Sequence, residues 1–458
     1  MPKNGENRGE KPPKGKKKLR VLLRTFGCQM NVRDSEIILG MLKEKGYAPV
    51  SKPDQAELVL FNTCSVRQHA EERVWGQAGM IKKRGARPVI GIVGCMAQNY
   101  QEQIFRRLPQ VDFVCGPANI YDIPLLIEKA LKEHSQLLAV NMEKRPLLCD
   151  NGYRISNLKA FVSIMYGCNN FCSYCIVPYV RGREVSRPLR HILAEVQDLA
   201  ARGFKEITLL GQNVNSYGKD LPGPLNFVRL LENLDRIKGI ERIRFVTSHP
   251  KDATPELFKA MRNLASVCEH LHLPLQAGSD KILHMMNRNY TLKDYLKLVD
   301  VLRRQVPDSA ISTDIIVGFP GETEKDFKKT EQAMKDIQFD EAFVFKYSPR
   351  FKTKAAEFKD DVSNKKKLQR NHRLLELQGA ISLKKNKHII GSTEEVLAEG
   401  KGSYFQGAKK KQAVLGRSRS NKVTLFPGKM DLISKLVRVR IKRTTAHTLI
   451  GEVDDKKN

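Results

Sequence analysis

Short apolar runs alternate with stretches of helical periodicity over the first third of the chain. In the stretch 32–45, Ile38 and Leu42 lie one helical turn apart, and Gly46 follows as a helix-ending residue. The runs predict buried strands at 20–25, 58–61 and 89–93, and the periodic stretches predict helices at 32–45, 66–80 and 98–108. Such alternation predicts a parallel sheet with helices on its faces.

The middle of the chain repeats this alternation on a larger scale. Strands are predicted at 161–165, 206–210, 243–246, 271–273, 311–317 and 342–345. Helices are predicted at 192–201, 227–234, 255–264, 292–301 and 324–337. Six strand–helix units predict a partial (βα)6 barrel, with a doubly wound sheet as the alternative. In both folds, ligands bind at the carboxyl ends of the strands.

The last part of the chain has a different pattern. A Lys-, Arg- and Leu-rich helix is predicted at 365–387, and short alternating runs split by Gly, Ser and Pro follow it. They predict a small antiparallel β-barrel. We therefore expect an α/β protein with a disordered basic tail at 1–18, an N-terminal parallel α/β domain at 19–145, a central barrel at 154–386 and a C-terminal barrel at 387–454.

Charge and composition narrow the classes of function that the chain can have. The 458 residues carry 80 Lys and Arg against 50 Asp and Glu, a formal net charge of +30, which indicates a polyanionic partner such as nucleic acid. No apolar run is long enough to cross a bilayer, and the N-terminus lacks the apolar core of a signal peptide. We therefore expect a cytoplasmic protein. Nine cysteines are too few for a disulfide scaffold and favour metal ligation.

Three cysteines follow the three predicted N-terminal strands. Cys28, Cys64 and Cys95 each come shortly after a strand, among small and polar residues. The carboxyl ends of parallel strands share one sheet edge, so the three thiols are expected to gather there as a metal site. The alternative is three unrelated buried thiols.

The motif most indicative of chemistry is Cys-x3-Cys-x2-Cys at Cys168, Cys172 and Cys175, directly after a predicted strand. Three close thiolates can hold three irons of a [4Fe–4S] cluster, and an iron without a protein ligand is open to a small molecule. The alternative is zinc in a non-catalytic RNA-binding protein, but structural zinc takes four ligands.

Together these motifs resemble the radical S-adenosylmethionine (SAM) superfamily, and the chain from about 19 to 454 is similar to its methylthiotransferase family. The resemblance rests on ordered motifs at 25–31, 62–67, 94–98, 166–183, 210–215, 272–279 and 313–323. It implies two [4Fe–4S] clusters, one on each cysteine triad, and two SAM molecules per turnover. It also implies that Tyr174 lies near the SAM adenine and that the C-terminal barrel is an RNA-binding domain of the TRAM type.

Within that family, the residues around Cys28 and Cys64 most resemble the branch acting on N6-isopentenyladenosine at position 37 of tRNA. The resemblance implies methylthiolation at C2 of that base by radical chemistry, with no catalytic side chain beyond the cluster cysteines. The alternatives are sibling enzymes acting on threonylcarbamoyl-adenosine or on a ribosomal protein aspartate. An electron donor such as flavodoxin or ferredoxin and a monomeric state are also expected.

Several further residues are candidates from their positions. Residues that follow strands of the central barrel are expected to contact SAM, namely Gln212, Asn213, Ser248 and Gln276. Basic residues of the C-terminal domain are expected to contact RNA phosphates, namely Arg417, Arg419 and Lys422. Cys115, Cys149 and Cys268 are interpreted as ordinary thiols, and His249 and His272 as structural histidines.

Overall fold

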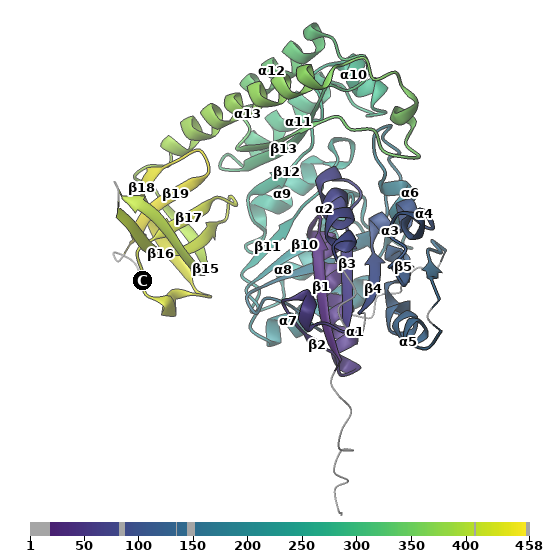
Figure 1. The fold of residues 1–458 in the computed structure, drawn as a ribbon. Coiled ribbons are helices and arrows are strands. Elements are labelled where there is room, and N and C mark those ends of the chain that lie inside the picture. The colour runs from purple at the N-terminus through teal and green to yellow at the C-terminus, as the bar shows by residue number, and fades with distance from the viewer. Residues whose placement is uncertain (1–18, 82–87, 134, 144–151, 407–408, 455–458) are drawn as a thin grey trace, which may run out of the picture.

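Three compact parts follow one another in the computed structural model (Figure 1). The structure describes residues 19–81, 88–133, 135–143, 152–406 and 409–454. The predicted tail at 1–18 and Cys149 lie outside the described residues. In the described part of the chain, no helix combines the length and apolar character that a bilayer crossing needs.

The N-terminal part is a six-stranded sheet in the order β2-β1-β3-β4-β5-β6 whose neighbours all pair in parallel. Its strands are β1 (Arg20–Phe26), β2 (Ala48–Pro49), β3 (Leu58–Thr63), β4 (Val89–Val93), β5 (Phe113–Cys115) and β6 (Leu137–Ala139). Its helices are α1 (Gln29–Glu44), α2 (Gln68–Gly79), α3 (Cys95–Tyr100), α4 (Gln103–Arg107) and α5 (Ile123–Glu133). The predicted helix at 98–108 is broken because Gln101 adopts a positive φ of 48° between α3 and α4.

The central part is the predicted partial barrel. Two parallel sheets, β11-β10-β7 and β12-β13-β14, are joined by a parallel bridge between Ile243 and Val267. The strands are β7 (Lys159–Ser163), β10 (Glu206–Leu210), β11 (Arg242–Phe245), β12 (His270–His272), β13 (Ala310–Val317) and β14 (Glu341–Lys346), with β8 (Met165–Tyr166) and β9 (Val185–Ser186) as a small hairpin. The helices are α6 (Val177–Arg181), α7 (Leu189–Ala201), α8 (Phe227–Asp235), α9 (Pro255–Asn263), α10 (Asp280–Met285), α11 (Leu292–Gln305) and α12 (Glu324–Ile337).

Side chains alternate across these strands between a packed outside and a polar inside. Odd-numbered residues of β11 to β13, such as Ile243, Leu271 and Ile315, join the apolar core beneath the helices. Their even-numbered neighbours, such as Arg244 and His272, therefore face the barrel interior, because strand residues point to opposite faces in turn.

Helix α13 (Asn364–Lys387) leads from the central part to a closed five-stranded barrel (Figure 1). Its strands are β15 (Thr393–Gln406), β16 (Lys409–Ser418), β17 (Val423–Phe426), β18 (Leu436–Thr444) and β19 (Thr448–Val453). The pairs are antiparallel as predicted, except that β17 and β19 run in parallel.

Buried charges join the N-terminal part to the central part. On α1, Arg33 lies 3.7 Å from Glu195 of α7, and Glu36 lies 3.9 Å from Arg154. Arg154 and Arg187 both donate to Glu195, at 2.6 and 2.5 Å. These side chains are buried, so the interface depends on a charge network rather than on apolar packing alone.

Candidate functional site

The structure brings Cys28, Cys64 and Cys95 together at one edge of the N-terminal sheet. The neighbouring Cys64 thiol, through a hydrogen bond, lowers the pKa of Cys28 to about 6. Burial raises the pKa of Cys95, and the charge of Cys28 adds to this effect. Three thiols that come from separate strand ends are therefore close enough to influence one another's pKa, and their sharing of one metal site stays a prediction.

Two asparagines and a glycine shape this edge. Asn31 Nδ2 donates to Asn62 Oδ1 at 3.0 Å, and Asn62 Nδ2 donates to the Asn31 carbonyl at 2.8 Å. Asn31 Oδ1 accepts from the Cys28 thiol at 3.3 Å. Gly27 has a φ of 153°, and a Cβ there would lie 2.5 Å from Cys64 Cβ, so glycine permits the close approach. Sequence reasoning missed both asparagines, although each lies within three residues of a cysteine.

The second group is the loop holding Cys168, Cys172 and Cys175. The Cys175 amide donates to the Cys172 carbonyl at 2.9 Å in a tight turn. Burial raises the pKa of Cys168 to about 11 and that of Cys175 to about 12, and the neighbouring thiols add to both shifts. Gly167 has a φ of 73°, where a Cβ would overlap the Arg183 carbonyl. The loop therefore holds Cys168, Cys172 and Cys175, the second cysteine triad, close together.

Arg288 is a buried cation beside this loop that sequence reasoning missed. Its Nη1 donates to Cys172 Sγ at 3.4 Å, its Nη2 to the Pro274 carbonyl at 3.2 Å and its Nε to the Tyr290 hydroxyl at 3.0 Å. A guanidinium stabilises nearby thiolates, because it stays charged at all relevant pH values.

Arg181 of α6 lies at the interface between the central part and the N-terminal cysteine group. Its Nη2 donates to Asp34 Oδ2 of α1 at 2.7 Å, and its positive charge opposes the rise in the pKa of the Cys95 thiol. Its side chain and that of Asp34 are 3% and 2% exposed, so the pair is buried between the domains. Cys95 also packs against Ile176 and Val180, which follow the Cys168 loop. The two triads thus lie on either side of one interface.

All four residues predicted to contact SAM have buried side-chain atoms without a hydrogen-bond partner. These atoms are Gln212 Oε1, Asn213 Oδ1, Ser248 Oγ and Gln276 Oε1. Each residue follows a strand of the central barrel, where a ligand is expected. Buried polar atoms are seldom left unpaired, so these four atoms are available to hydrogen bond a ligand at the strand ends. Tyr174 packs in an apolar cluster with Met285, Tyr290 and Ile316.

The residues present fit two iron–sulfur clusters. Each triad offers three thiolates, whereas structural zinc takes four ligands. Within the described ranges, no three or more His, Cys, Asp or Glu side chains form a group placed to hold a metal ion. A cubane takes its thiolates on different irons, so its ligands stand farther apart than those of one ion. The unpaired amide oxygens of Gln212, Asn213 and Gln276 suit hydrogen-bond donors of a ligand such as SAM, and the Ser248 hydroxyl can donate or accept.

The three predicted RNA contacts lie where the C-terminal barrel meets the central domain. Arg419 pairs with Glu269 at 2.6 Å, and Lys422 Nζ donates to Asp340 Oδ1 at 2.9 Å and Asn386 Oδ1 at 3.0 Å. Arg417 Nη1 donates to the Asn421 carbonyl at 3.1 Å. Domain docking is thus the observed role of Arg419 and Lys422, and RNA contact stays a prediction.

Other candidates have ordinary surroundings. Cys115 and Cys268 are buried, and burial raises the pKa of each thiol. His249 is buried with a pKa lowered to about 2 by burial.

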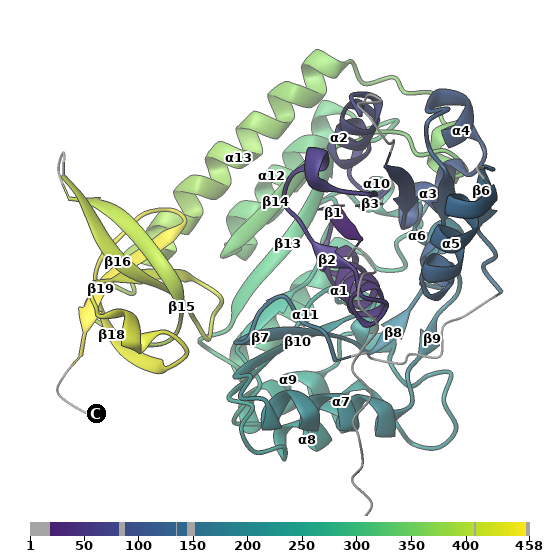
Figure 2. The ribbon, with the colours of Figure 1, turned by 60° about the horizontal axis from the view of Figure 1, so that its bottom comes forward.

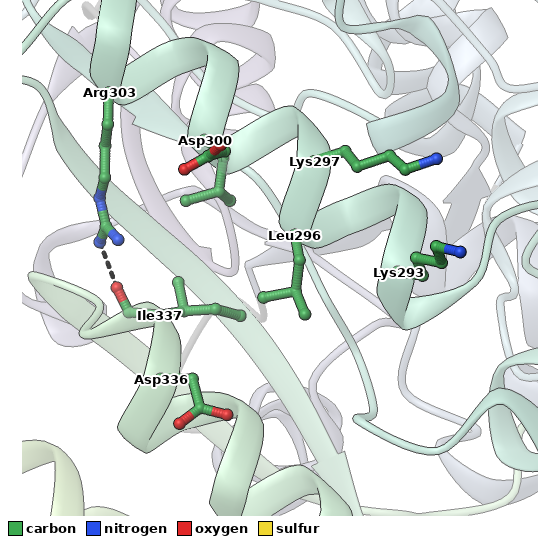
Figure 3. Close-up of a pocket in the computed structure, with 8 residues that line it drawn as sticks. Lys293, Leu296, Lys297, Asp300, Arg303, Asp336 and Ile337 are labelled. Carbon is green, nitrogen blue, oxygen red and sulfur yellow. Dashed lines mark hydrogen bonds between the residues drawn. The ribbon is translucent and has the colours of Figure 1, made fainter.

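The groove in Figure 3 lies on the outer helical layer, between α11 and α12, so it is not part of the site at the strand ends. It is lined by Lys293, Leu296, Lys297, Val299, Asp300, Arg303, Asp336 and Ile337.

Comparisons with known proteins match this architecture. The radical SAM superfamily model matches residues 162–334, and the model of uncharacterized protein family UPF0004 matches residues 20–116. A solved structure of the radical S-adenosylmethionine methyltransferase TsrM from Kitasatospora setae aligns with a TM-score of 0.56 at 13% identity, covering 86% of this chain and 78% of that one. The fold and the cysteine loop thus define a radical SAM enzyme.

Two curated relatives specify the family further. The tRNA-2-methylthio-N(6)-dimethylallyladenosine synthase of Thermoanaerobacter sp. (strain X514) is 49% identical over 443 residues, covering 95% of this chain and 93% of the relative. The synthase of the same name from Moorella thermoacetica is 46% identical over 448 residues, covering 96% and 99%. The chain belongs to the family of tRNA-2-methylthio-N(6)-dimethylallyladenosine synthases.

Proposed function

We propose that this enzyme adds a methylthio group to C2 of N6-dimethylallyladenosine at position 37 of tRNA. The observation that carries the proposal is that Cys95 packs against Ile176 and Val180, which follow the Cys168 loop, at an interface that the Arg181–Asp34 pair spans. Two metal centres near one substrate would suit a reaction that both cleaves SAM and delivers sulfur. The family relationship supplies the substrate class.

Cys168, Cys172 and Cys175 would hold the cluster that binds SAM, and Cys28, Cys64 and Cys95 would hold a second [4Fe–4S] cluster. When bound, the first cluster supplies the electron that cleaves SAM to a 5′-deoxyadenosyl radical, since adenine C2–H has no acidic proton. Two SAM molecules would be used per turnover, one as radical source and one as methyl donor.

The chain's own residues bind and orient the reactants. Gln212, Asn213, Ser248 and Gln276 present unpaired polar atoms for the polar groups of SAM. Arg288 holds positive charge against the Cys172 sulfur. Arg181 holds positive charge near Cys95 and fixes α6 to α1, so the distance between the two triads is set by a buried ion pair.

RNA is expected to bind through exposed basic residues of the C-terminal barrel. Arg438, Arg440 and Lys442 alternate along the exposed side of β18, and Lys409–Lys411 lie exposed on β16. Such a surface suits backbone phosphates. The substrate base in the anticodon loop would have to leave its stack to reach the cysteine groups.

We further propose that the enzyme is a cytoplasmic monomer and that flavodoxin or ferredoxin supplies its electrons.

The test is a nucleoside analysis by mass spectrometry. Reconstituted enzyme with SAM and a reductant is given tRNA carrying N6-dimethylallyladenosine or N6-threonylcarbamoyladenosine. We expect 2-methylthio product from the first tRNA only. Product from the second alone, or from a ribosomal protein, would assign the enzyme to a sibling branch. Zinc without acid-labile sulfide in the protein would contradict radical chemistry.

A further inference from the structure

The inner face of β14 leaves two aromatic rings uncovered inside the barrel. Ala342 and Val344 of this strand pack outward against the main core, which includes Leu374 of α13. Their neighbours Phe343 and Phe345 therefore point inward, and they remain 41% and 39% exposed. Two exposed rings on one face of the strand offer an apolar surface that a ligand can cover.

Phe345 lies close to the loop that holds Cys168, Cys172 and Cys175. The register of the sheet sets Phe345 opposite Ile316 on β13. Ile316 packs in the same apolar cluster as Tyr174, which stands between Cys172 and Cys175 in the chain. A molecule lying on Phe345 would therefore be next to the second triad.

The segment that follows β14 contacts residues next to Cys64 of the N-terminal cysteine triad. Immediately after β14, Ser348 Oγ donates to Gln68 Oε1 at 2.8 Å, and Arg350 Nη2 donates to the Val66 carbonyl at 2.9 Å. Val66 and Gln68 follow Cys64 in the chain. The segment after β14 thus lies against the segment that follows Cys64, and Figure 2 shows β14 beside β13 in the central part.

Polar groups border the aromatic surface on one side. The His272 ring lies edge-on to Phe343 with ring centroids 6.1 Å apart. His272 Nδ1 is 2.9 Å from Ser312 Oγ, and its Nε2 is 3.4 Å from Asp314 Oδ2. Asp314 is the register partner of Phe343. The surface therefore offers two apolar rings flanked by an oriented carboxylate.

We propose that Phe343 and Phe345 form the subsite for the apolar N6 substituent of the substrate adenosine. This inference rests on the proposed function and specifies its substrate recognition. A dimethylallyl group suits two aromatic faces, whereas the carboxylate of a threonylcarbamoyl group would be desolvated there and repelled by Asp314. The subsite thereby selects one substituent over the other.

The test measures binding, separately from catalysis. Two synthetic anticodon stem-loops differ only in whether the adenosine carries the N6-dimethylallyl group, and their Kd values for anaerobic, reconstituted enzyme are measured by fluorescence anisotropy. The wild type is expected to prefer the prenylated RNA. Phe343→Ala and Phe345→Ala are each expected to reduce that preference roughly tenfold, as lost aromatic contacts do, with little change in Kd for the unmodified RNA.

Leu296→Ala is the matched control, because Leu296 is an exposed apolar side chain on the outer helix α11. It should leave the preference unchanged. Phe345→Leu keeps apolar volume and should retain part of the preference. Unchanged preference in both alanine variants, with melting temperatures near that of the wild type, would overturn the subsite. Failure of the wild type to thiolate the prenylated tRNA would instead overturn the proposed function.

Discussion

Arg419 of the C-terminal barrel forms a bidentate pair with Glu269 of the central domain, with Nε 2.8 Å from Oε2 and Nη2 2.6 Å from Oε1. The same guanidinium donates to the Val267 carbonyl at 2.6 Å. In the opposite direction, Arg242 of β11 donates to the carbonyls of Glu395 and Arg417 in the barrel. Arginines from both sides thus hold the two domains together.

Arg419→Ala is expected to destabilise the protein by about 2 kcal/mol, because charge-assisted hydrogen bonds are lost and Glu269 keeps no guanidinium partner. Differential scanning calorimetry would detect this as a lower or split melting transition. Arg438→Ala, on the exposed side of β18, is the control and should melt like the wild type. Equal melting of the two variants would show that the Arg419 pair contributes nothing to docking.

Cys168→Ala and Cys28→Ala are expected to separate the two halves of the reaction. Removing Cys168 should abolish 5′-deoxyadenosine formation from SAM, whereas removing Cys28 should leave that formation and abolish methylthiolation. Each variant should hold about four Fe instead of about eight per chain. Cys115→Ala, in the core of the N-terminal sheet, should keep the full iron content. Unchanged SAM cleavage by Cys168→Ala would contradict the assignment.

Asp34→Ala should be strongly destabilising. The change leaves the Arg181 guanidinium buried without its carboxylate, and such a loss costs about 3–5 kcal/mol. The control is Asp198→Ala, since Asp198 pairs with Arg202 at 3.0 Å on the exposed surface. Thermal unfolding should show several degrees of loss for Asp34→Ala and almost none for Asp198→Ala. Equal losses would mean that burial of the Arg181 pair is energetically unimportant.

His270 should make the fold sensitive to acid. Burial, with added repulsion from Arg244 and His272, lowers its pKa to about 3, and Ser312, Asp340 and Lys422 complete its surroundings. A depressed histidine pKa contributes stability above the unfolded value of about 6.5, and this is lost as pH falls toward 3.

The expected slope from this one group is about 1.4 kcal/mol per pH unit below pH 6.5. His270→Gln keeps a partner for Ser312 but cannot titrate, so its melting temperature should fall less between pH 7 and pH 5. The comparison uses the difference between the two proteins, because other groups titrate in both. Identical pH profiles would show that His270 is not kept neutral by the fold.

The repeated strand–helix pattern in the sequence was enough to predict most of the architecture. The strand at Glu206–Leu210 and the helix at Glu324–Ile337 match their predicted bounds, because their apolar periodicity is strong. The short edge strand β6 was missed, since three residues carry too little pattern. The break at Gln101 was also missed, because nothing local marks a non-glycine residue that adopts a positive φ.

Contacts in the site between residues far apart in the chain could not be predicted from the sequence. Arg288 reaches Cys172 from 116 positions away, and one arginine in a polar stretch gives no sign of such a contact. Arg419 and Lys422 carry the same charge whether they meet phosphate or a carboxylate of the chain. Phe343 and Phe345 belong to the strand predicted at 342–345, and only the packing of Ala342 and Val344 and the register with β13 show which side they face.

The ionic network along α1 has a consequence for substrate entry. Swinging the N-terminal part away from the central part would expose or separate several buried charges at once, at a high cost in free energy. Hinge opening is therefore an expensive route to the space between the cysteine groups. The nucleic acid, whose loop can be distorted for a few kcal/mol per unstacked base, is the component that changes shape when the two meet.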